Sequence, residues 1–263
     1  MTNISPIWLT IIFSMIAFFI TSLGGAVILF FKGINQKLMQ FILSFSAGVM
    51  IASSIFSLIN VAIEQCESLS QNAGIVCTLG VFCGMLFIIF TEIFIDKSLK
   101  SSKTLKKYVS GKYREPVMSM IAISLHNIPE GLCIGVAFAG ASLIGGVGNI
   151  MNAIALSVGI GLQNFPEGAS VSLPLYNAGI SKAKSFLLGM FSGVVEPIFA
   201  VIGFVFTDII SSFLPFLLTF AGGTMIAVSC VELLPESFCG DKNISTLGLG
   251  VGFCLMMIMD LML

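Results

Sequence analysis

The chain has 263 residues, of which 57% are hydrophobic and only 10% are charged. Soluble domains carry about 25% charged residues, so this composition excludes an ordinary soluble protein. The formal net charge of −1 gives no electrostatic basis for binding nucleic acid. The chain therefore belongs in a membrane, and its few polar residues within apolar segments are the features that need a physical explanation.

Long apolar segments follow one another along the whole chain. A run of about 20 such residues between polar breaks is long enough to cross a bilayer as a helix. We predict one domain, 1–263, with spanning helices over 7–31, 38–63, 72–95, 117–140, 150–174, 183–206, 211–235 and 244–263. The first segment is too long for the apolar region of a signal peptide, so we interpret it as a spanning helix. The predicted fold class is an all-α polytopic membrane protein with eight transmembrane helices.

The basic residues indicate the orientation of these helices. Every Lys and Arg falls in the first, third, fifth or seventh loop or, as Lys184 does, within two residues of one, whereas Glu64, Glu67 and Asp208 lie in even-numbered loops. The positive-inside rule then places the odd loops in the cytoplasm and both termini outside a cell membrane. The basic loop 96–116 serves in this interpretation as a topology signal; binding to anionic lipid is the alternative.

A polar pattern occurs twice inside the apolar segments. It reads SLHNIPEG over 124–131 and GLQNFPEG over 161–168. His126 and Glu130 are four residues apart, as are Gln163 and Glu167, so each pair shares one helix face. The proline inside each motif removes a backbone N–H, and we expect a kink there. The two helices are thus predicted to direct imidazole, carboxylate and amide groups to one point.

Three carboxylates lie deep inside predicted spans, namely Glu130, Glu167 and Glu196. An ionised carboxylate at the bilayer centre costs roughly 3 kcal/mol, so three unpaired ones would cost about 9 kcal/mol, as much as the stability of a whole protein. No Lys or Arg lies deep inside a predicted span to neutralise them. Protonation, a water-filled cavity or a bound cation remain, and the neighbouring His126 and amides favour the cation.

Each ligand candidate also has a purely structural alternative. A lone histidine is usually a core residue, but the glutamate one turn from His126 and the duplicated motif favour a ligand. Asn127 and Asn164 can instead form hydrogen bonds between helices. Glu196 repeats the pairing of a carboxylate with a proline, and Met50 offers either a thioether ligand or packing.

The donor types indicate the class of metal. Imidazole with carboxylate and amide oxygens suits Zn²⁺, Fe²⁺, Mn²⁺ or Cd²⁺, whereas the lack of convergent thiolates argues against Cu(I). Glu232 and Glu236 can form an exit site, or can simply be solvated carboxylates at the interface. The seven cysteines form no CxxC pair; Cys66 and Cys77 flank one short loop and can pair there.

The chain also contains an internal repeat. FSAGVMIASS at 45–54 aligns with FAGGTMIAVS at 220–229, in helices predicted to run in opposite directions. We interpret this as three helices, a central pair and three inverted helices, an arrangement that recurs in carriers with a midplane site. Chance similarity between two glycine-rich helices is the alternative.

These segments, HNIPEG, QNFPEG, SGVVEP at 192–197 and FSAGVM at 45–50, resemble the ZIP (Zrt/Irt-like) divalent metal transporters of the GufA-like branch. The resemblance covers essentially the whole chain. It implies an eight-helix carrier in a 3+2+3 inverted arrangement, with both termini outside, that moves Zn²⁺ and related ions toward the cytoplasm.

The resemblance also implies two adjacent metal sites. The primary site maps to His126, Glu130, Gln163 and Glu167, with Met50 as a fifth ligand, and the secondary site maps to Asn127, Asn164 and Glu196. Other branches place His where Gln163 stands, and some members place Asp where Asn164 stands. The neutral amides of this chain lower the negative charge of the second site.

The sequence therefore predicts a membrane carrier for divalent metal ions. A channel-like facilitator is the first alternative, and a membrane metal-binding protein that transports nothing is the second. A metalloenzyme with an HExxH motif is excluded because the chain has one histidine. We expect the metal to be the cargo, with no organic cofactor, and the partners to be divalent ions, the lipid bilayer and a second copy in a homodimer. Metal binding should displace protons from the glutamates, so uptake should depend on pH.

Overall fold

The structure is a computed structural model that describes residues 5–30, 35–101, 114–144 and 147–262. Inside these ranges, the side chains of some helical residues lie outside the described part, and His126 is one of them. The predicted loop 96–116 is shorter than expected, because α4 (Ala73–Ser101) and α5 (Arg114–Ile144) both extend into it. Its remainder, 102–113, lies outside the described residues.

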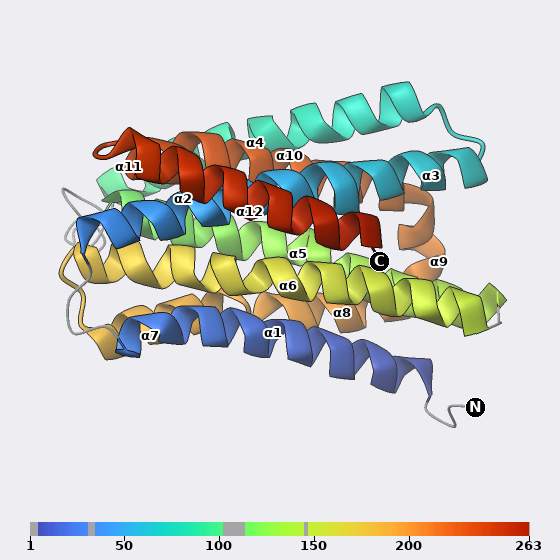
Figure 1. The fold of residues 1–263 in the computed structure, drawn as a ribbon. Coiled ribbons are helices and arrows are strands. Elements are labelled where there is room, and N and C mark those ends of the chain that lie inside the picture. Colours follow the sequence, from blue (N-terminus) through green and yellow to red (C-terminus); the bar gives the residue numbers. More distant parts are fainter. Residues whose placement is uncertain (1–4, 31–34, 102–113, 145–146, 263) are drawn as a thin grey trace.

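Helices occupy every range in which the sequence predicts one, and the described residues contain no strand (Figure 1). The uninterrupted helices, besides α4 and α5, are α1 (Pro6–Phe30), α6 (Val147–Asn177) and α12 (Lys242–Met262). α5 and α6 stay helical through Pro129, Pro166 and Pro174.

The other helices contain irregular turns. α2 (Gln36–Ser53) continues through a π-helical segment, η1 (Ser54–Ile59), into α3 (Asn60–Ser68). α7 (Lys182–Ser192) and α8 (Val195–Val205) are separated by a two-residue break. The last group is α9 (Thr207–Ile210), the 3₁₀ turn η4 (Ser211–Phe213), α10 (Leu214–Val228), the π-helical segment η5 (Ser229–Leu233) and α11 (Leu234–Ser237).

Six of the described helices are long and apolar enough to cross a membrane, by length and composition. They are Pro6–Phe30, Gln36–Ser68, Ala73–Thr91, Lys182–Val205, Thr207–Ser237 and Lys242–Leu261. α5 and α6, which carry the two PEG motifs, are not among these six, although each has 31 residues. The protein is thus all-helical with several candidate spans, and the count of eight stays a prediction.

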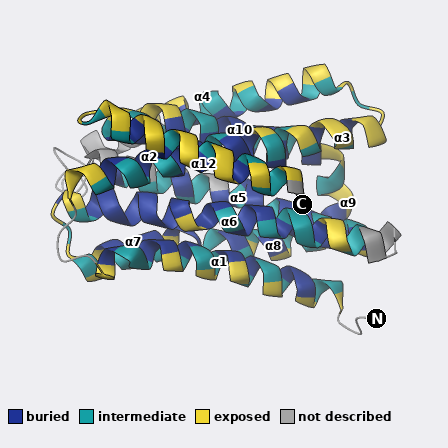
Figure 2. Cartoon of the chain, in the orientation of Figure 1, coloured by how far each residue is buried: buried dark blue, intermediate teal, exposed yellow. Residues whose placement is uncertain are grey.

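The helices pack as two bundles that meet along a seam. α1 packs on α6 and α5 on α8, whereas α2 packs on α12 and α4 on α10 (Figure 1). Across the seam, α5 contacts α10 and α6 contacts α2. Figure 2 shows that α5 and α6 are buried over much of their length, while α12 presents many exposed residues. The most polar helices therefore lie at the centre of the molecule.

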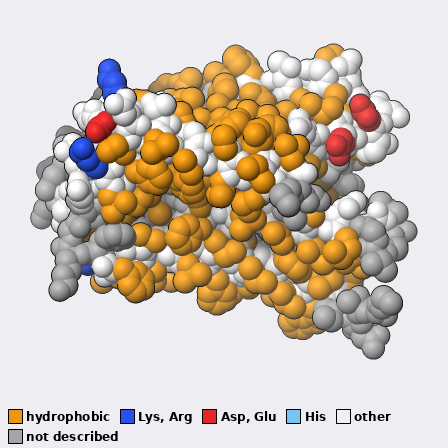
Figure 3. Space-filling view, in the orientation of Figure 1, with side chains coloured by type: hydrophobic (Ala, Val, Ile, Leu, Met, Phe, Trp, Pro, Cys, Tyr) orange, Lys and Arg blue, Asp and Glu red, His pale blue; other side chains and the backbone are white. Residues whose placement is uncertain are grey.

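Charges gather at the two ends of the molecule. Figure 3 shows hydrophobic side chains over the middle of one face, acidic side chains where α3 lies, and basic side chains at the opposite end, where α2 begins. Large apolar side chains such as Phe90 and Phe94 are more than half exposed, as in a helix facing lipid. This distribution fits a multi-pass membrane protein.

The seven cysteines are free thiols, and those at Cys66 and Cys77 are buried. The pairing of Cys66 with Cys77 that the sequence allows is therefore not formed in this structure.

Candidate metal centre

The polar residues of both PEG motifs are removed from the molecular surface. Asn127 and Glu130 on α5, and Gln163, Asn164 and Glu167 on α6, have no exposed surface. Glu196, in the first turn of α8, is equally buried. A buried carboxylate or amide is costly unless its polar atoms find partners. The arrangement of these partners therefore decides what the centre can do.

The first contact joins the two motif helices. Gln163 Nε2 donates a hydrogen bond to Glu130 Oε1 at 2.5 Å. This bond links the third residue of the α6 pattern GLQNFPEG to the glutamate of the α5 pattern. A charge-assisted bond of this kind is short because the acceptor is a carboxylate.

The two asparagines also connect helices, which was the structural alternative for them. Asn164 Nδ2 donates to Glu196 Oε2 at 2.6 Å and so ties α6 to α8. Asn127 Nδ2 donates to the backbone carbonyl oxygen of Ser192 at 3.2 Å and so ties α5 to the end of α7. In both residues, the amide nitrogen is used by the protein.

The oxygen atoms of the same amides receive no hydrogen bond from the described residues. Among the described residues, none donates a hydrogen bond to Asn127 Oδ1, Gln163 Oε1, Asn164 Oδ1 or Glu196 Oε1, although all four are buried. An amide oxygen can only accept, so a positive ligand is the natural partner for such a group of atoms. No three His, Cys, Asp or Glu side chains of the described part lie close enough together to form a metal site by themselves.

The centre contains three carboxylates, those of Glu130, Glu167 and Glu196, and all three are fully buried. Like charges in a low-dielectric interior repel strongly, and a doubly charged cation among them would reverse the sign of that interaction.

The glycine of each motif sets how closely the helices approach. A Cβ added at Gly131 would overlap the backbone carbonyl oxygen of Glu196, and one at Gly168 would overlap that of Thr21. Glycine is thus required at both positions, because it lets α5 lie against α8 and α6 against α1. The packing at Gly131 also brings Glu196 beside the α5 motif.

Met50 lies on the α2 face that meets the α6 motif. Ser46 Oγ donates to the carbonyl oxygen of Pro166 at 3.1 Å, and Ser57 lies near Gly159, so the two helices are antiparallel. Met50 is one turn beyond Ser46, which places it at the level of Gln163, one turn before Pro166. Met50 has no exposed surface, and its thioether is either packed or available as a ligand.

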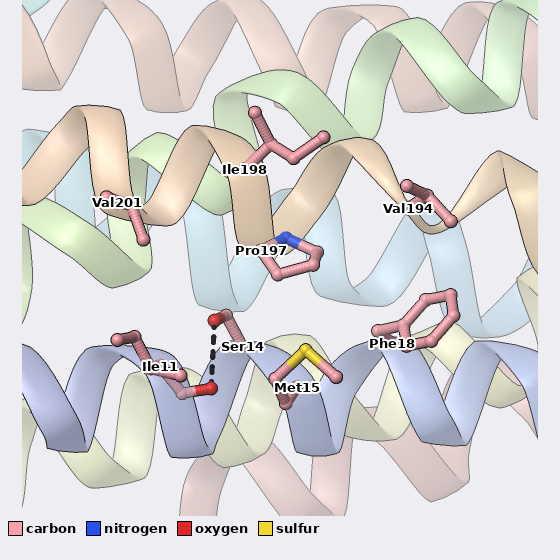
Figure 4. A pocket seen from close by; sticks show the side chains of 8 residues that line it. All are labelled: Ile11, Ser14, Met15, Phe18, Val194, Pro197, Ile198 and Val201. Atoms are coloured by element: carbon pink, nitrogen blue, oxygen red, sulfur yellow. Dashed lines mark hydrogen bonds between the residues drawn. The ribbon is translucent and has the colours of Figure 1, made fainter.

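A separate groove between α1 and α8 has a volume of about 490 Å³. Figure 4 shows its apolar lining, including Ile11, Phe18 and Pro197, and Ser14, whose hydroxyl donates to the Ile11 carbonyl oxygen at 3.2 Å. Apart from the Ser14 hydroxyl and the Met15 thioether, the lining is apolar, so it does not have the oxygen and nitrogen donors of a divalent-cation site. The polar centre lies elsewhere, among α5, α6 and α8.

Comparison with known proteins adds an independent finding. The sequence profile of the family described as ZIP Zinc transporter matches residues 8–118 and 100–260. The chain belongs to the ZIP family. It is 30% identical to zinc transporter GufA of Myxococcus xanthus, over 95% of this chain and 97% of the relative. It is also 30% identical to zinc transporter ZupT of Clostridium perfringens, over 97% and 95%, and 28% identical to zinc transporter ZIP11 of Xenopus tropicalis, over 97% of each chain.

Within this ZIP protein, the structure brings together most of the residues that the sequence singled out. Glu130 is bonded to Gln163, Glu196 to Asn164, and Met50 lies at the level of Gln163. The side chain of His126 lies outside the described residues. Glu232 and Glu236, the residues of the predicted exit site, are half-buried in η5 and α11.

Sequence reasoning missed Ser46 and Ser192, which hold this ZIP centre through their hydroxyl and carbonyl groups. Ser46 gives no signal beyond its place in the repeated segment. Ser192 does give one, because Pro197 five residues later predicts a disturbed helix with unsatisfied carbonyl groups.

Proposed function

We propose that this ZIP protein moves a divalent transition-metal ion, Zn²⁺ first and also Fe²⁺, Mn²⁺ or Cd²⁺, across the membrane toward the cytoplasm. The ion would bind between α5 and α6 to His126, Glu130, Gln163 and Glu167, with Met50 completing the shell. Asn127, Asn164 and Glu196 would form the adjacent position. The family and the zinc transporters among its relatives support metal transport.

One observation carries this assignment. Three buried amides at the centre use their nitrogens on protein acceptors and leave their oxygens, together with one oxygen of Glu196, without a donor among the described residues. A water site would satisfy such acceptors too, but a neutral water would not offset the charge of the buried carboxylates. A divalent cation would do both.

We further infer the 3+2+3 inverted arrangement, with eight spans and both termini outside. The π-helical segments η1 and η5 begin at Ser54 and Ser229, which are aligned in the internal repeat. The helices that pack on each other also correspond between the two halves, as an inverted repeat requires. The packing of α1 on α6 corresponds to that of α8 on α5, and the packing of α2 on α12 corresponds to that of α10 on α4. Such pairing supports a two-fold relation between the halves.

The two bundles suggest how the ion would pass. Both motif helices and α8 belong to one bundle, together with α1, whereas Met50 lies on α2 of the other. Movement of the first bundle along the seam would carry the ion and its oxygen ligands past Met50. Access would then alternate between the two faces of the membrane.

The test is uptake of radioactive Zn²⁺ into proteoliposomes that contain Glu130→Ala or Glu167→Ala. We expect uptake to fall by at least about a hundredfold in each variant, since outer-shell partners of a metal alone are worth up to that factor. Glu64→Ala is the control, because Glu64 is exposed on α3. Unchanged uptake in both motif variants would defeat the assignment. Counterflow and saturation of the wild-type protein would separate a carrier from a channel-like facilitator.

A further inference from the structure

The break between α7 and α8 follows from a proline in the first turn of α8. Pro197 has no N–H, so the Gly193 carbonyl oxygen lacks its normal helical donor four residues ahead. Glu196 N donates to that oxygen instead, at 3.2 Å. In a regular helix, Glu196 N would bond to the carbonyl oxygen of Ser192. The proline thereby leaves the Ser192 carbonyl group without a donor from its own helix.

Asn127 supplies the missing donor from another helix. Its Nδ2 lies 3.2 Å from the Ser192 carbonyl oxygen. Asn127 has no exposed surface and Ser192 is 2% exposed, so water does not replace this bond. An unpaired buried carbonyl group is costly, and Asn127 removes that cost.

The break in turn fixes Glu196. This residue lies in the first turn of α8, four positions after Ser192, and its carboxylate accepts from Asn164. Asn164 thus holds the side chain of Glu196, while Asn127 holds the backbone from which that side chain projects. There is no room for the segment to shift toward α1, because a Cβ at Gly193 would already lie 3.0 Å from Thr21.

We propose that Asn127 is a positioning residue for Glu196, acting through its amide nitrogen at the α7–α8 break, in addition to any role of its oxygen as a ligand. This inference rests on the proposed transport function for its uptake readout. It assigns different tasks to the two asparagines of the duplicated motif.

The first test separates the nitrogen from the oxygen. Asn127→Asp keeps an oxygen in place but has no N–H to donate, and Asn127→Ala has neither. We expect both variants to lose Zn²⁺ uptake in proteoliposomes by about tenfold in Vmax, the effect of one lost buried hydrogen bond. Asn152→Asp, which introduces the same change at an exposed position of α6, should transport as the wild type does. Wild-type uptake by Asn127→Asp would overturn the proposal.

The second test repairs the break itself. Pro197→Ala restores an N–H that can bond to Gly193 and release Glu196 N to Ser192. Asn127→Asp, which keeps an oxygen at this position, should then lower Vmax by less than about twofold in the Pro197→Ala background, as expected for two coupled sites. In a Glu196→Ala background, Asn127→Asp should cause no further loss of uptake, because the residue that Asn127 positions is absent. Equal losses in all three backgrounds would overturn the proposal.

The same set of variants can be compared by stability, without a transport measurement. Melting temperature in detergent should fall for Asn127→Ala and recover in the double variant with Pro197→Ala. Should Asn127→Ala fail to accumulate, recovery of accumulation by Pro197→Ala supports the inference, and no recovery contradicts it. If the wild-type protein moves no Zn²⁺, the proposed function fails while the melting cycle still decides the role of Asn127.

Discussion

The two PEG motifs share a sequence pattern and differ in what their side chains hold. On α6, Gln163 and Asn164 both donate to carboxylates, those of Glu130 and Glu196. On α5, Asn127 donates to a backbone carbonyl group at a helix break. The glycines behave alike, since Gly131 and Gly168 each lie against the backbone of a neighbouring helix.

The difference comes from the neighbours and not from the motifs. α5 packs on α8, whose helix is broken before Pro197, whereas α6 packs on α1, which is continuous from Pro6 to Phe30. A broken helix offers an unpaired carbonyl group to an asparagine, and a continuous helix offers none. The glycines of the two motifs therefore share a packing role, while the polar residues of the two motifs have separate tasks.

Substitution of the motif glycines should give the largest effect on stability and tests whether their roles are equal. Gly131→Ala and Gly168→Ala each place a Cβ against a backbone carbonyl oxygen, which cannot move aside as a side chain can. We expect each to cost about 3 kcal/mol, the upper range for overpacking, and to lower the melting temperature in detergent by roughly 8 °C.

Two other glycines are the controls for this experiment. A Cβ at Gly140 on α5 meets nothing within 4 Å, and one at Gly161, at the opposite end of the α6 motif from Gly168, has its nearest contact at 3.4 Å, with Ile20. Alanine at these positions should be neutral or slightly stabilising, because alanine favours a helix by about 1 kcal/mol over glycine. If only one motif glycine were sensitive, the two helices would not share a packing role.

The sequence predicted the helix ranges and the pairing of the two motifs because both depend on local patterns. The length of each apolar segment sets the span, and the four-residue spacing sets the helix face that carries Glu130 on α5 and the face that carries Glu167 on α6. The family was also recognisable from the motifs, and the profile match confirms it.

The hydrogen-bond partners of the motif residues could not be predicted in the same way. That Asn127 bonds to Ser192, and Ser46 to Pro166, depends on which helices pack and at what register. Register between helices is set by glycine contacts distant in sequence, such as Gly131 against Glu196. The break at Gly193 was likewise not predicted, although Pro197 marks the region, because a proline alone does not say whether a helix bends or ends.

The α6 motif can be made more like the α5 motif by Gln163→His. An imidazole offers a better donor atom for Zn²⁺ than an amide oxygen, and hard ions such as Mn²⁺ gain less from it. We expect the KM for Zn²⁺ uptake to fall relative to that for Mn²⁺ by about tenfold, equivalent to about 1.4 kcal/mol. Loss of uptake for both ions would instead show that the amide bond from Gln163 to Glu130 is indispensable.

The smallest effect is expected in the bundle that carries neither motif. Lys37 on α2 forms an ion pair with Asp241 before α12, at 3.3 Å, and its side chain is 65% exposed. Exposed pairs contribute little, so Lys37→Ala should change Zn²⁺ uptake by less than about twofold. The hydrogen bond from Lys37 lowers the pKa of Asp241.

The direction of this pKa shift decides in which pH range the Lys37–Asp241 ion pair stabilises the folded protein. A lowered pKa means that the folded protein binds the proton more weakly. The stabilisation is therefore complete above the ordinary pKa of about 3.9 and is lost as pH falls through the lowered value. Lys37→Ala should leave the pH profile of uptake between about pH 5 and 8 unchanged. A pH dependence in that range that survives Lys37→Ala but disappears in Glu130→Gln or Glu167→Gln would have to come from the motif glutamates, where metal and proton compete for the same oxygens.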